Sequence, residues 1–293
     1  MEINENEIPN EWMISEIELN CNNRDKSQKL KKLPNLIWNL SNLQKLNCSY
    51  NHLNLLHDSI RSLSNLQELY CHNNQLKNLP DSIGNLSNLK SLCCCGNQLK
   101  TLPNSIENLI KLEFLSCSKN KLKKLPDSIG NLRNLQSLIC DTNELKSLPE
   151  SICSLSNLRW LYCYYNELKS LPNSIGNLRN LQKLDCYKNQ LTKLPESIGS
   201  LSNLQWLNCT RNQLISLPES IGSLSNLTGL HCFDNKLTHL PESIGNLENL
   251  EQLYCDNNPI TNIPKDLLNK HVNIVNEFKT YLNMKNKTGP KSI

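Results

Sequence analysis

Residues 89–112, LKSLCCCGNQLKTLPNSIENLIKL, hold one copy of the 23-residue repeat that decides the fold, and their last leucine begins the next copy. In this repeat, Leu-x-x-Leu-x-Cys-x-x-Asn-x-Leu is followed by Leu-Pro-x-Ser-Ile and a further leucine. A cysteine recurs every 23 residues from Cys48 to Cys255, ten times in all, and an asparagine follows three residues after each. Self-similarity at a fixed period predicts stacked repeats that each contact their neighbours, rather than one globular core.

The apolar positions of the repeat predict a continuous core with two kinds of local structure. The Leu-x-Cys segment alternates inward and outward side chains over a short length, as a β-strand does. The Ser-Ile-Gly-x-Leu segment follows a proline, which suits the first turn of a short helical or 3-10 segment on the opposite side. The repeated asparagine is expected in a tight turn, where its amide can hydrogen-bond backbone groups of adjacent coils.

The ten repeat cysteines occupy slots that require inward apolar side chains, so we interpret them as buried, reduced thiols. Stacked strands lie about 4.8 Å apart, which fits poorly with the roughly 3.8 Å between the Cβ atoms of a disulfide. Free thiols indicate an intracellular, cytoplasmic protein. The acidic segment Met1–Trp12 lacks the apolar run of a secretory signal. No stretch approaches the ~18 apolar residues of a membrane span.

The repeat phase divides the chain into three predicted segments. Residues 1–29 form an irregular N-terminal cap, in which Ile14, Ile17, Leu19 and Cys21 predict a degraded first strand. Residues 30–264 form the array of about ten repeats. Residues 265–293 are expected to form a capping helix followed by a disordered basic tail from Asn286 onward, with a partner-binding amphipathic helix as the alternative.

The text Leu-Pro-x-Ser-Ile-Gly-x-Leu-x-Asn-Leu-x-x-Leu occurs at residues 79–92, 125–138 and 171–184. In this sequence pattern, the chain resembles leucine-rich repeat proteins of the 23-residue class, such as plant intracellular Ras-group-related and other Ras-binding-type proteins. The resemblance implies an α/β solenoid, a curved horseshoe with a parallel β-sheet on its concave face and short helical or 3-10 segments on its convex face. It also implies protein binding, with a small GTPase or another signalling protein as a candidate partner. The chain departs from the family by having cysteine where leucine is usual.

Aromatic residues gather at the positions that the strand phase turns outward, which are three and one before each repeat cysteine and one and two after it. These positions hold eleven of the fifteen aromatic residues, and an even scatter would place far fewer there. Rings among polar groups are typical of protein-binding hot spots. The predicted partner-binding residues are Tyr70, Phe114, Trp160, Tyr162, Tyr164, Tyr165, Tyr187, Trp206, Arg211, Phe233 and Tyr254.

Three other interpretations stay open. The rings could stack on one another across strands and serve only as a structural scaffold. Binding of single-stranded nucleic acid also uses rings and basic groups, but acidic residues such as Asp185 and Asp234 interrupt the basic track. Cys93 and Cys95 supply two of the four ligands that zinc requires, so incidental substitution is favoured over a metal site. No catalytic motif is recognisable, and we predict a non-enzymatic interaction module without a cofactor or metal.

Overall fold

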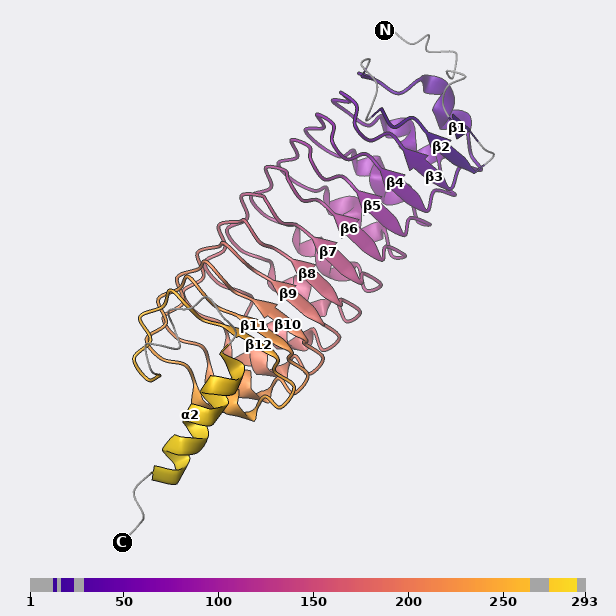
Figure 1. Ribbon diagram of the computed structural model, residues 1–293. Coiled ribbons are helices and arrows are strands. Elements are labelled where there is room, and N and C mark those ends of the chain that lie inside the picture. The colour runs from indigo at the N-terminus through magenta and orange to yellow at the C-terminus, as the bar shows by residue number, and fades with distance from the viewer. Residues whose placement is uncertain (1–12, 15–16, 24–28, 264–273, 289–293) are drawn as a thin grey trace. The chain divides into compact units, whose positions relative to one another are not determined.

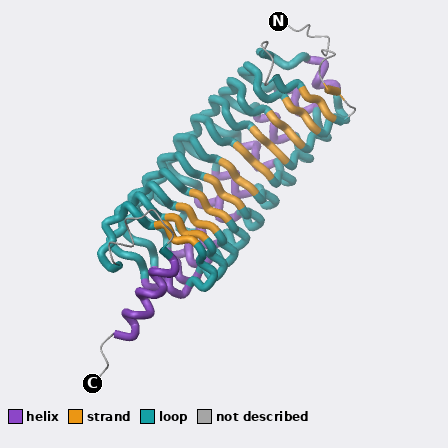
Figure 2. Tube along the Cα trace, viewed as in Figure 1, coloured by secondary structure: helices purple, strands orange, loops and turns teal. Residues whose placement is uncertain are grey.

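The computed structural model describes residues 13–14, 17–23, 29–263 and 274–288. The chain divides into two compact units, residues 1–158 (unit 1) and residues 159–293 (unit 2). Each unit is a stack of coils, and each coil is one 23-residue repeat. Figure 2 shows that, within each unit, the strands (orange) lie on one side of the coils and the 3-10 turns (purple) on the other.

Unit 1 contains strands and 3-10 turns that alternate along the chain from β2 onward (Figure 1). Its strands are β1 (Met13–Ile14), β2 (Glu18–Asn20), β3 (Lys45–Asn47), β4 (Glu68–Tyr70), β5 (Ser91–Cys93), β6 (Phe114–Ser116) and β7 (Ser137–Ile139). Its 3-10 turns are η1 (Asn35–Asn39), η2 (Asp58–Ser62), η3 (Asp81–Asn85), η4 (Asn104–Asn108), η5 (Asp127–Asn131) and η6 (Glu150–Ser154). Strands β2 to β7 pair in parallel and in sequence order, each residue with its equivalent in the next coil.

Unit 2 continues the same alternation and ends in an α-helix. Its strands are β8 (Trp160–Tyr162), β9 (Lys183–Asp185), β10 (Trp206–Asn208), β11 (Gly229–His231) and β12 (Gln252–Tyr254). Its helical segments are η7 (Ile175–Asn177), η8 (Glu196–Ser200), η9 (Glu219–Ser223), η10 (Glu242–Asn246) and α2 (Val275–Thr288). Strands β8 to β12 are parallel and in register, so the predicted repeat solenoid with 3-10 turns is confirmed in each unit.

The core of each coil consists of the leucines, the isoleucine and the cysteine of the repeat. In the coil of β4, Leu66, Leu69, Cys71 and Ile83 are completely excluded from solvent. Entry into most 3-10 turns is set by a proline such as Pro80, whose ring fixes φ and which precedes the first turn residue. At His57, which replaces this proline, the imidazole accepts a hydrogen bond from the Ser59 N–H and caps η2 instead.

The repeated asparagine joins successive coils, as the sequence predicts. Asn189 is representative. Its Oδ1 accepts from the Leu168 N–H at 2.9 Å, and its Nδ2 donates to the carbonyls of Cys163 and Cys186 at 3.1 and 3.0 Å. Because the side chain is buried, these bonds satisfy backbone groups that water cannot reach. The asparagines are therefore structural.

The repeat cysteines are buried thiols that form a ladder along the strands. Cys71, for example, donates through Sγ to the Cys93 carbonyl at 3.5 Å. All fourteen cysteines of the chain lie in its described part, and none of them forms a disulfide. Burial raises the pKa of Cys48 and Cys209 to about 12, so these thiols stay protonated at neutral pH. The ladder is part of the core and carries no reactive group.

The two ends differ in detail from the predictions. Strand β2 extends the parallel pairing by one strand, with Leu19 and Cys21 buried as expected. Ile17, which was included in the predicted first strand, lies just before β2 begins and is 48% exposed. Strand β1 adds an antiparallel partner that the repeat pattern does not predict. Residues 1–12 and 24–28 of the predicted cap lie outside the described residues.

Helix α2 packs its apolar residues on the last coil of unit 2. Phe278 and Leu282 are buried, and the Ile274 N–H donates to the Leu253 carbonyl of β12 at 3.2 Å. Since the apolar face is already covered, the structure argues against a free partner-binding helix at this end. The helix extends to Thr288. Residues 264–273 and 289–293 lie outside the described residues.

Candidate functional site

The side chains that the strands turn away from the core form the strand face. We define it by four positions per coil: three and one before the ladder cysteine, and one and two after it. In most strands the central leucine is fully buried and the two flanking residues are partly exposed, as in β9 and β10. The structure thus places all eleven predicted binding residues on this face, nine in unit 2 and two in unit 1.

The last position of the strand face has a left-handed backbone in every regular coil. The residues with φ between 50° and 63° are Tyr50, Asn73, Gly96, Lys119, Thr142, Tyr165, Lys188, Arg211, Asp234 and Asn257. This conformation costs about 1–2 kcal/mol for a residue with a Cβ atom, and glycine occupies it only once. The sequence pattern gave no sign of this, because glycine is the usual signal of such a turn. The strained position carries two of the predicted binding residues, Tyr165 and Arg211.

Three strands of unit 2 bring a lysine between two rings. The Lys183 Nζ on β9 lies 5.5 Å from the ring centre of Tyr162 on β8 and 5.4 Å from that of Trp206 on β10. Trp160, which pairs with Lys183 across the strands, is 37% exposed. Cation–π contacts favour these side-chain positions, and the rings present apolar area to solvent.

A second row of rings follows the turns after the same strands. The Tyr165 ring lies 5.9 Å from Tyr164 and 5.2 Å from Tyr187, both edge to face. The Lys188 Nζ lies 4.5 Å from the Tyr165 ring centre, and Arg211 donates to the Tyr187 hydroxyl at 2.8 Å. The hydrogen bond to Tyr165, followed by burial, raises the pKa of Tyr187. Tyr165 remains 41% exposed.

Gly229 makes room for the ring of Trp206. A Cβ atom at residue 229 would lie 2.5 Å from Cε3 and 2.7 Å from Cζ3 of Trp206, so the indole occupies the space that a side chain at this position of β11 would take. The ring centre of Trp206 is 4.3 Å from that of His231, which in turn lies 4.7 Å from Tyr254. Burial lowers the pKa of His231, which keeps this imidazole neutral at neutral pH.

The sequence pattern did not identify Gly229 and His231 as site residues. A usable signal existed for Gly229, because it is a glycine inside a strand, where glycine marks close approach of another group. The sequence offered no such signal for His231, whose role depends on the ring of the preceding coil.

The remaining predicted residues are less closely grouped. Phe233 lies half-buried on the turn after β11. In unit 1, the Tyr70 hydroxyl donates to Glu68 at 3.0 Å, and burial is the main cause that raises the pKa of Tyr70. Phe114 begins β6 of the same unit. The ring cluster of unit 2 therefore consists of Trp160, Tyr162, Tyr164, Tyr165, Lys183, Tyr187, Lys188, Trp206, Arg211, His231 and Tyr254.

Acidic groups interrupt the positive charge of the ring cluster. The Arg211 Nε–Asp234 Oδ2 ion pair measures 3.0 Å, and Asp185 lies beside Tyr162 in the strand register. Asp256 is buried on the same face. The face is thus mixed in charge, which suits polar and apolar contacts with a protein better than a phosphate backbone.

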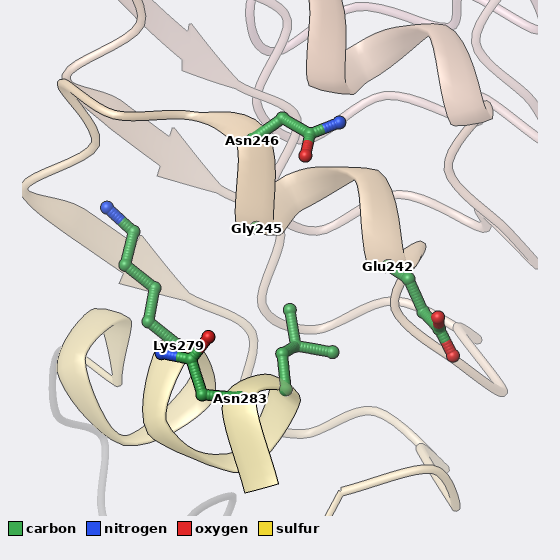
Figure 3. A pocket seen from close by; sticks show the side chains of 6 residues that line it. Glu242, Gly245, Asn246, Lys279 and Asn283 are labelled. Carbon is green, nitrogen blue, oxygen red and sulfur yellow. The ribbon is translucent and has the colours of Figure 1, made fainter. Parts of the chain in front are cut away.

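Two pockets lie elsewhere in unit 2. One is lined by residues of the η8 side, including Lys193 and Pro195. The other lies between η10 and α2 and is lined by Glu242, Gly245 and Asn246 of η10 and by Lys279, Leu282 and Asn283 of the helix (Figure 3). Lys285 pairs with Glu242 at the same junction. The second pocket is a polar groove between α2 and the last coil, on which the helix packs.

Within the described ranges, no group of three or more His, Cys, Asp or Glu side chains is arranged to hold a metal ion. In the same ranges, no helix combines the length and the apolar character needed to cross a membrane.

Comparison with known proteins identifies the repeats. The sequence matches the family profile described as "Leucine-rich repeat region" over residues 94–190 and 186–272, together more than half of the chain. Residues 64–109 match "Leucine Rich repeats (2 copies)". No curated protein matches the chain significantly.

Solved structures with the same architecture include two plant receptors and one bacterial protein. The plant peptide hormone receptor RGFR1, in complex with RGF2, is 34% identical with a TM-score of 0.72, and the match covers 78% of this chain and 38% of the receptor. The functional domain of InlJ from Listeria monocytogenes, which includes a cysteine ladder, is 27% identical (TM-score 0.71; 83% and 49% covered). The ectodomain of the receptor kinase GASSHO1/SCHENGEN3 from Arabidopsis thaliana, in complex with CASPARIAN STRIP INTEGRITY FACTOR 2, is 30% identical (TM-score 0.68; 77% and 31% covered). The chain spans a third to a half of the length of these proteins.

Proposed function

The chain belongs to the leucine-rich repeat family, and from this we propose that the strand face of unit 2 binds a protein or peptide partner. Leucine-rich repeat domains typically act as non-enzymatic modules for protein interaction. The observation that carries the proposal is the ring cluster, in which aromatic side chains are held by cations and by one another while Trp160 and Tyr165 stay exposed.

The physical argument is one of preorganisation. Aromatic residues and arginine dominate the energetics of protein interfaces, because they bury large areas around a few polar contacts. An ordered side chain also loses less entropy on binding, which otherwise costs about 0.5–1.5 kcal/mol for each flexible side chain immobilised. Contacts with Lys183 favour the positions of the Tyr162 and Trp206 rings in the unbound chain. Two of the similar plant receptors are themselves in complex with a named ligand, RGF2 or CASPARIAN STRIP INTEGRITY FACTOR 2, which supports the same use here.

A finer assignment is also proposed. The 23-residue consensus favours the class of the plant intracellular Ras-group-related and other Ras-binding-type proteins, with a small GTPase or another signalling protein as partner. Fourteen free cysteines favour a reducing, cytoplasmic compartment. The similar GASSHO1/SCHENGEN3 structure is an ectodomain, so the compartment rests on the cysteines of this chain alone. Fractionation of cells that express the chain, followed by thiol labelling, tests it: a disulfide-linked extracellular form contradicts this assignment.

A purely structural role is the second candidate, and specific contacts favour it in part. The edge-to-face pairs Tyr164–Tyr165 and Tyr165–Tyr187 are of the kind that stabilises neighbouring strands. A scaffold of this kind requires no partner. It predicts that removal of the rings lowers stability without changing what the protein binds.

Affinity purification separates the two candidates. The natural chain is compared with the triple variant Trp160→Ala/Tyr162→Ala/Trp206→Ala, and an Ile215→Ala variant serves as control, since Ile215 is 60% exposed outside the strand face. Specific partners are expected with the natural and control chains and not with the folded triple variant. Recovery of the same partners with all three chains refutes the proposal. Retention on single-stranded nucleic acid that falls steeply with salt would instead support the nucleic-acid alternative.

A further inference from the structure

We propose that Cys93 and Cys95 form a redox-active dithiol on the strand face of unit 1, which reacts with low-molecular-weight disulfides and closes to an intramolecular disulfide. This inference is independent of the proposed partner site, which lies in unit 2. It rests on the positions of the two sulfurs, on their exposure and on the contrast with the other twelve cysteines of the chain.

The two thiols point to the same side of strand β5. Cys93 ends the strand, Cys94 turns into the core, and Cys95 follows on the outer side. The Sγ atoms of Cys93 and Cys95 lie 3.5 Å apart, in direct contact. Both residues are partly exposed, whereas Cys94 between them is fully buried and belongs to the ladder. A small reagent can therefore reach the outer pair but not the ladder.

The two thiols have different environments. The hydrogen bond from Cys93 is the main cause that lowers the pKa of Cys95 to about 7, and Ser116 and Ser118 act in the same direction. The same contact raises the pKa of Cys93. At neutral pH a larger fraction of Cys95 is then thiolate than for an ordinary cysteine with a pKa near 8.5. The pair thus has a nucleophile and a resolving thiol.

Neighbouring strands complete the surroundings of the dithiol. Tyr70 on β4 and Ser116 on β6 pair with Cys93 in the sheet register. The same register places His72 beside Cys95, and burial lowers the pKa of this imidazole. His72 is therefore neutral at neutral pH. The Cys93 thiol and the two serine hydroxyls, rather than a cation, stabilise the Cys95 thiolate.

The reaction balances with an external disulfide as the oxidant. The Cys95 thiolate attacks one sulfur of the disulfide RSSR, forms a mixed disulfide and releases RS⁻. The Cys93 thiol gives its proton to RS⁻ and then attacks the Cys95 sulfur, which breaks the bond to the second RS group. The products are one Cys93–Cys95 disulfide, one RSH and one RS⁻, which takes its proton from water in place of the proton that Cys95 lost on ionisation, so two electrons pass from the dithiol to RSSR.

Closure requires a local change of the backbone after β5, although the two sulfurs are already in contact. Residues two apart on an extended segment have Cα atoms about 6.6 Å apart, at the upper end of the roughly 4.4–6.8 Å found for disulfides, and their Cβ atoms must approach to roughly 3.8 Å. A bond at this limit on an accessible surface is of the labile kind that cellular thiols reduce again. We therefore expect reversible oxidation rather than a permanent structural bridge.

Oxidation of the full chain by glutathione disulfide tests the inference. After reaction at neutral pH, the chain is unfolded and free thiols are capped with maleimide. The mass of the tryptic peptide of residues 91–100 is then measured by mass spectrometry. The natural chain is expected to lose two hydrogens in this peptide, with maleimide on Cys94 alone and no glutathione. The Cys93→Ser variant is expected to retain glutathione on Cys95, because no resolving thiol remains. The Cys95→Ser variant is expected to react at least ten-fold more slowly.

Two controls keep the result specific. Cys153→Ser alters a thiol whose pKa burial raises to about 12, and it must leave the oxidation of peptide 91–100 unchanged. The pH profile of Cys95 alkylation should have its midpoint near 7 in the natural chain and a higher midpoint in Cys93→Ser, since the hydrogen bond is lost. Equal reactivity of Cys93 and Cys95 overturns the proposal. So does a natural chain whose peptide 91–100 stays reduced, together with a Cys93→Ser variant that carries no glutathione on Cys95.

Discussion

Gly229→Ala tests whether the ring of Trp206 is fixed in the way that defines the ring cluster. The added Cβ would lie 2.5 Å from Trp206 Cε3, so the indole must leave the backbone of β11. Displacement removes the tilted ring contact with His231, worth about 0.5–1.5 kcal/mol, and the contact with Lys183, worth about 0.5–1 kcal/mol. Alanine in a strand gains back about 0.5–1 kcal/mol relative to glycine.

The net effect on the free energy of unfolding is therefore a loss of about 1 kcal/mol in the natural background. In a Trp206→Ala background no ring obstructs the new methyl group, and the same change is expected to stabilise the chain by about 0.5–1 kcal/mol. The sign of the effect thus depends on Trp206. A double-mutant cycle should give a coupling of about 1–2 kcal/mol.

Urea denaturation of the natural chain, the two single variants and the double variant measures this coupling, and tryptophan emission reports the ring itself. Emission is expected to shift when Ala replaces Gly229 in the natural background. Effects that add to within about 0.5 kcal/mol, with unchanged emission, would show that the indole does not lie over Gly229.

Three further predictions concern the scaffold. Asn189→Ala leaves the Leu168 N–H and two carbonyls without their partner and should cost about 2–4 kcal/mol in urea denaturation; a loss under about 1 kcal/mol would contradict the structural role of the asparagines. Burial raises the pKa of Cys209 to about 12, whereas the thiol of an unfolded chain titrates near 8.5. Between these two pH values the unfolded state binds fewer protons than the folded state, so the free energy of unfolding falls as pH rises. The fall is about 1.4 kcal/mol per pH unit for each such thiol. Cys209→Ala should reduce this alkaline slope by that amount, and an unaltered slope between about pH 9 and 10 would exclude the thiol as its source. Lys119→Gly should raise the free energy of unfolding by about 0.5–1 kcal/mol because its φ is 51°, while Gly96→Ala (φ 63°) should lower it; effects of the same sign would rule out backbone strain as the cause.

Most of the fold could be predicted because the same pattern of core and turn residues recurs in ten coils. A cysteine and an asparagine at fixed spacing place Cys71 in the core and Asn74 in the turn, and the inter-coil hydrogen bonds of Asn74 follow from the need to satisfy buried backbone groups. The ends were predicted less well, because they do not repeat. Strand β1 and the exposure of Ile17 depend on contacts that occur once.

The candidate site could be predicted only in part, for the same reason. The strand phase assigns Trp160 and Trp206 to one face, but it does not show which ring packs on which neighbour. The place of Trp206 depends on the missing side chain of Gly229 in the next coil. The left-handed backbone of Tyr165 left no trace in the sequence, because the coil imposes it on whatever residue is present. The contact between Cys93 and Cys95 likewise required rotamers as well as spacing.

Site-specific photo-crosslinking tests the central claim, that the strand face of unit 2 contacts a protein partner. A benzophenone amino acid is placed at Tyr165, which is 41% exposed within the ring cluster, or at Ile215, which is 60% exposed outside it. Irradiation in cells is expected to trap a defined protein from residue 165 and not from residue 215, and Trp206→Ala should abolish the trapped species. The same species trapped from residue 215, or none from residue 165 in a folded chain, would contradict the claim.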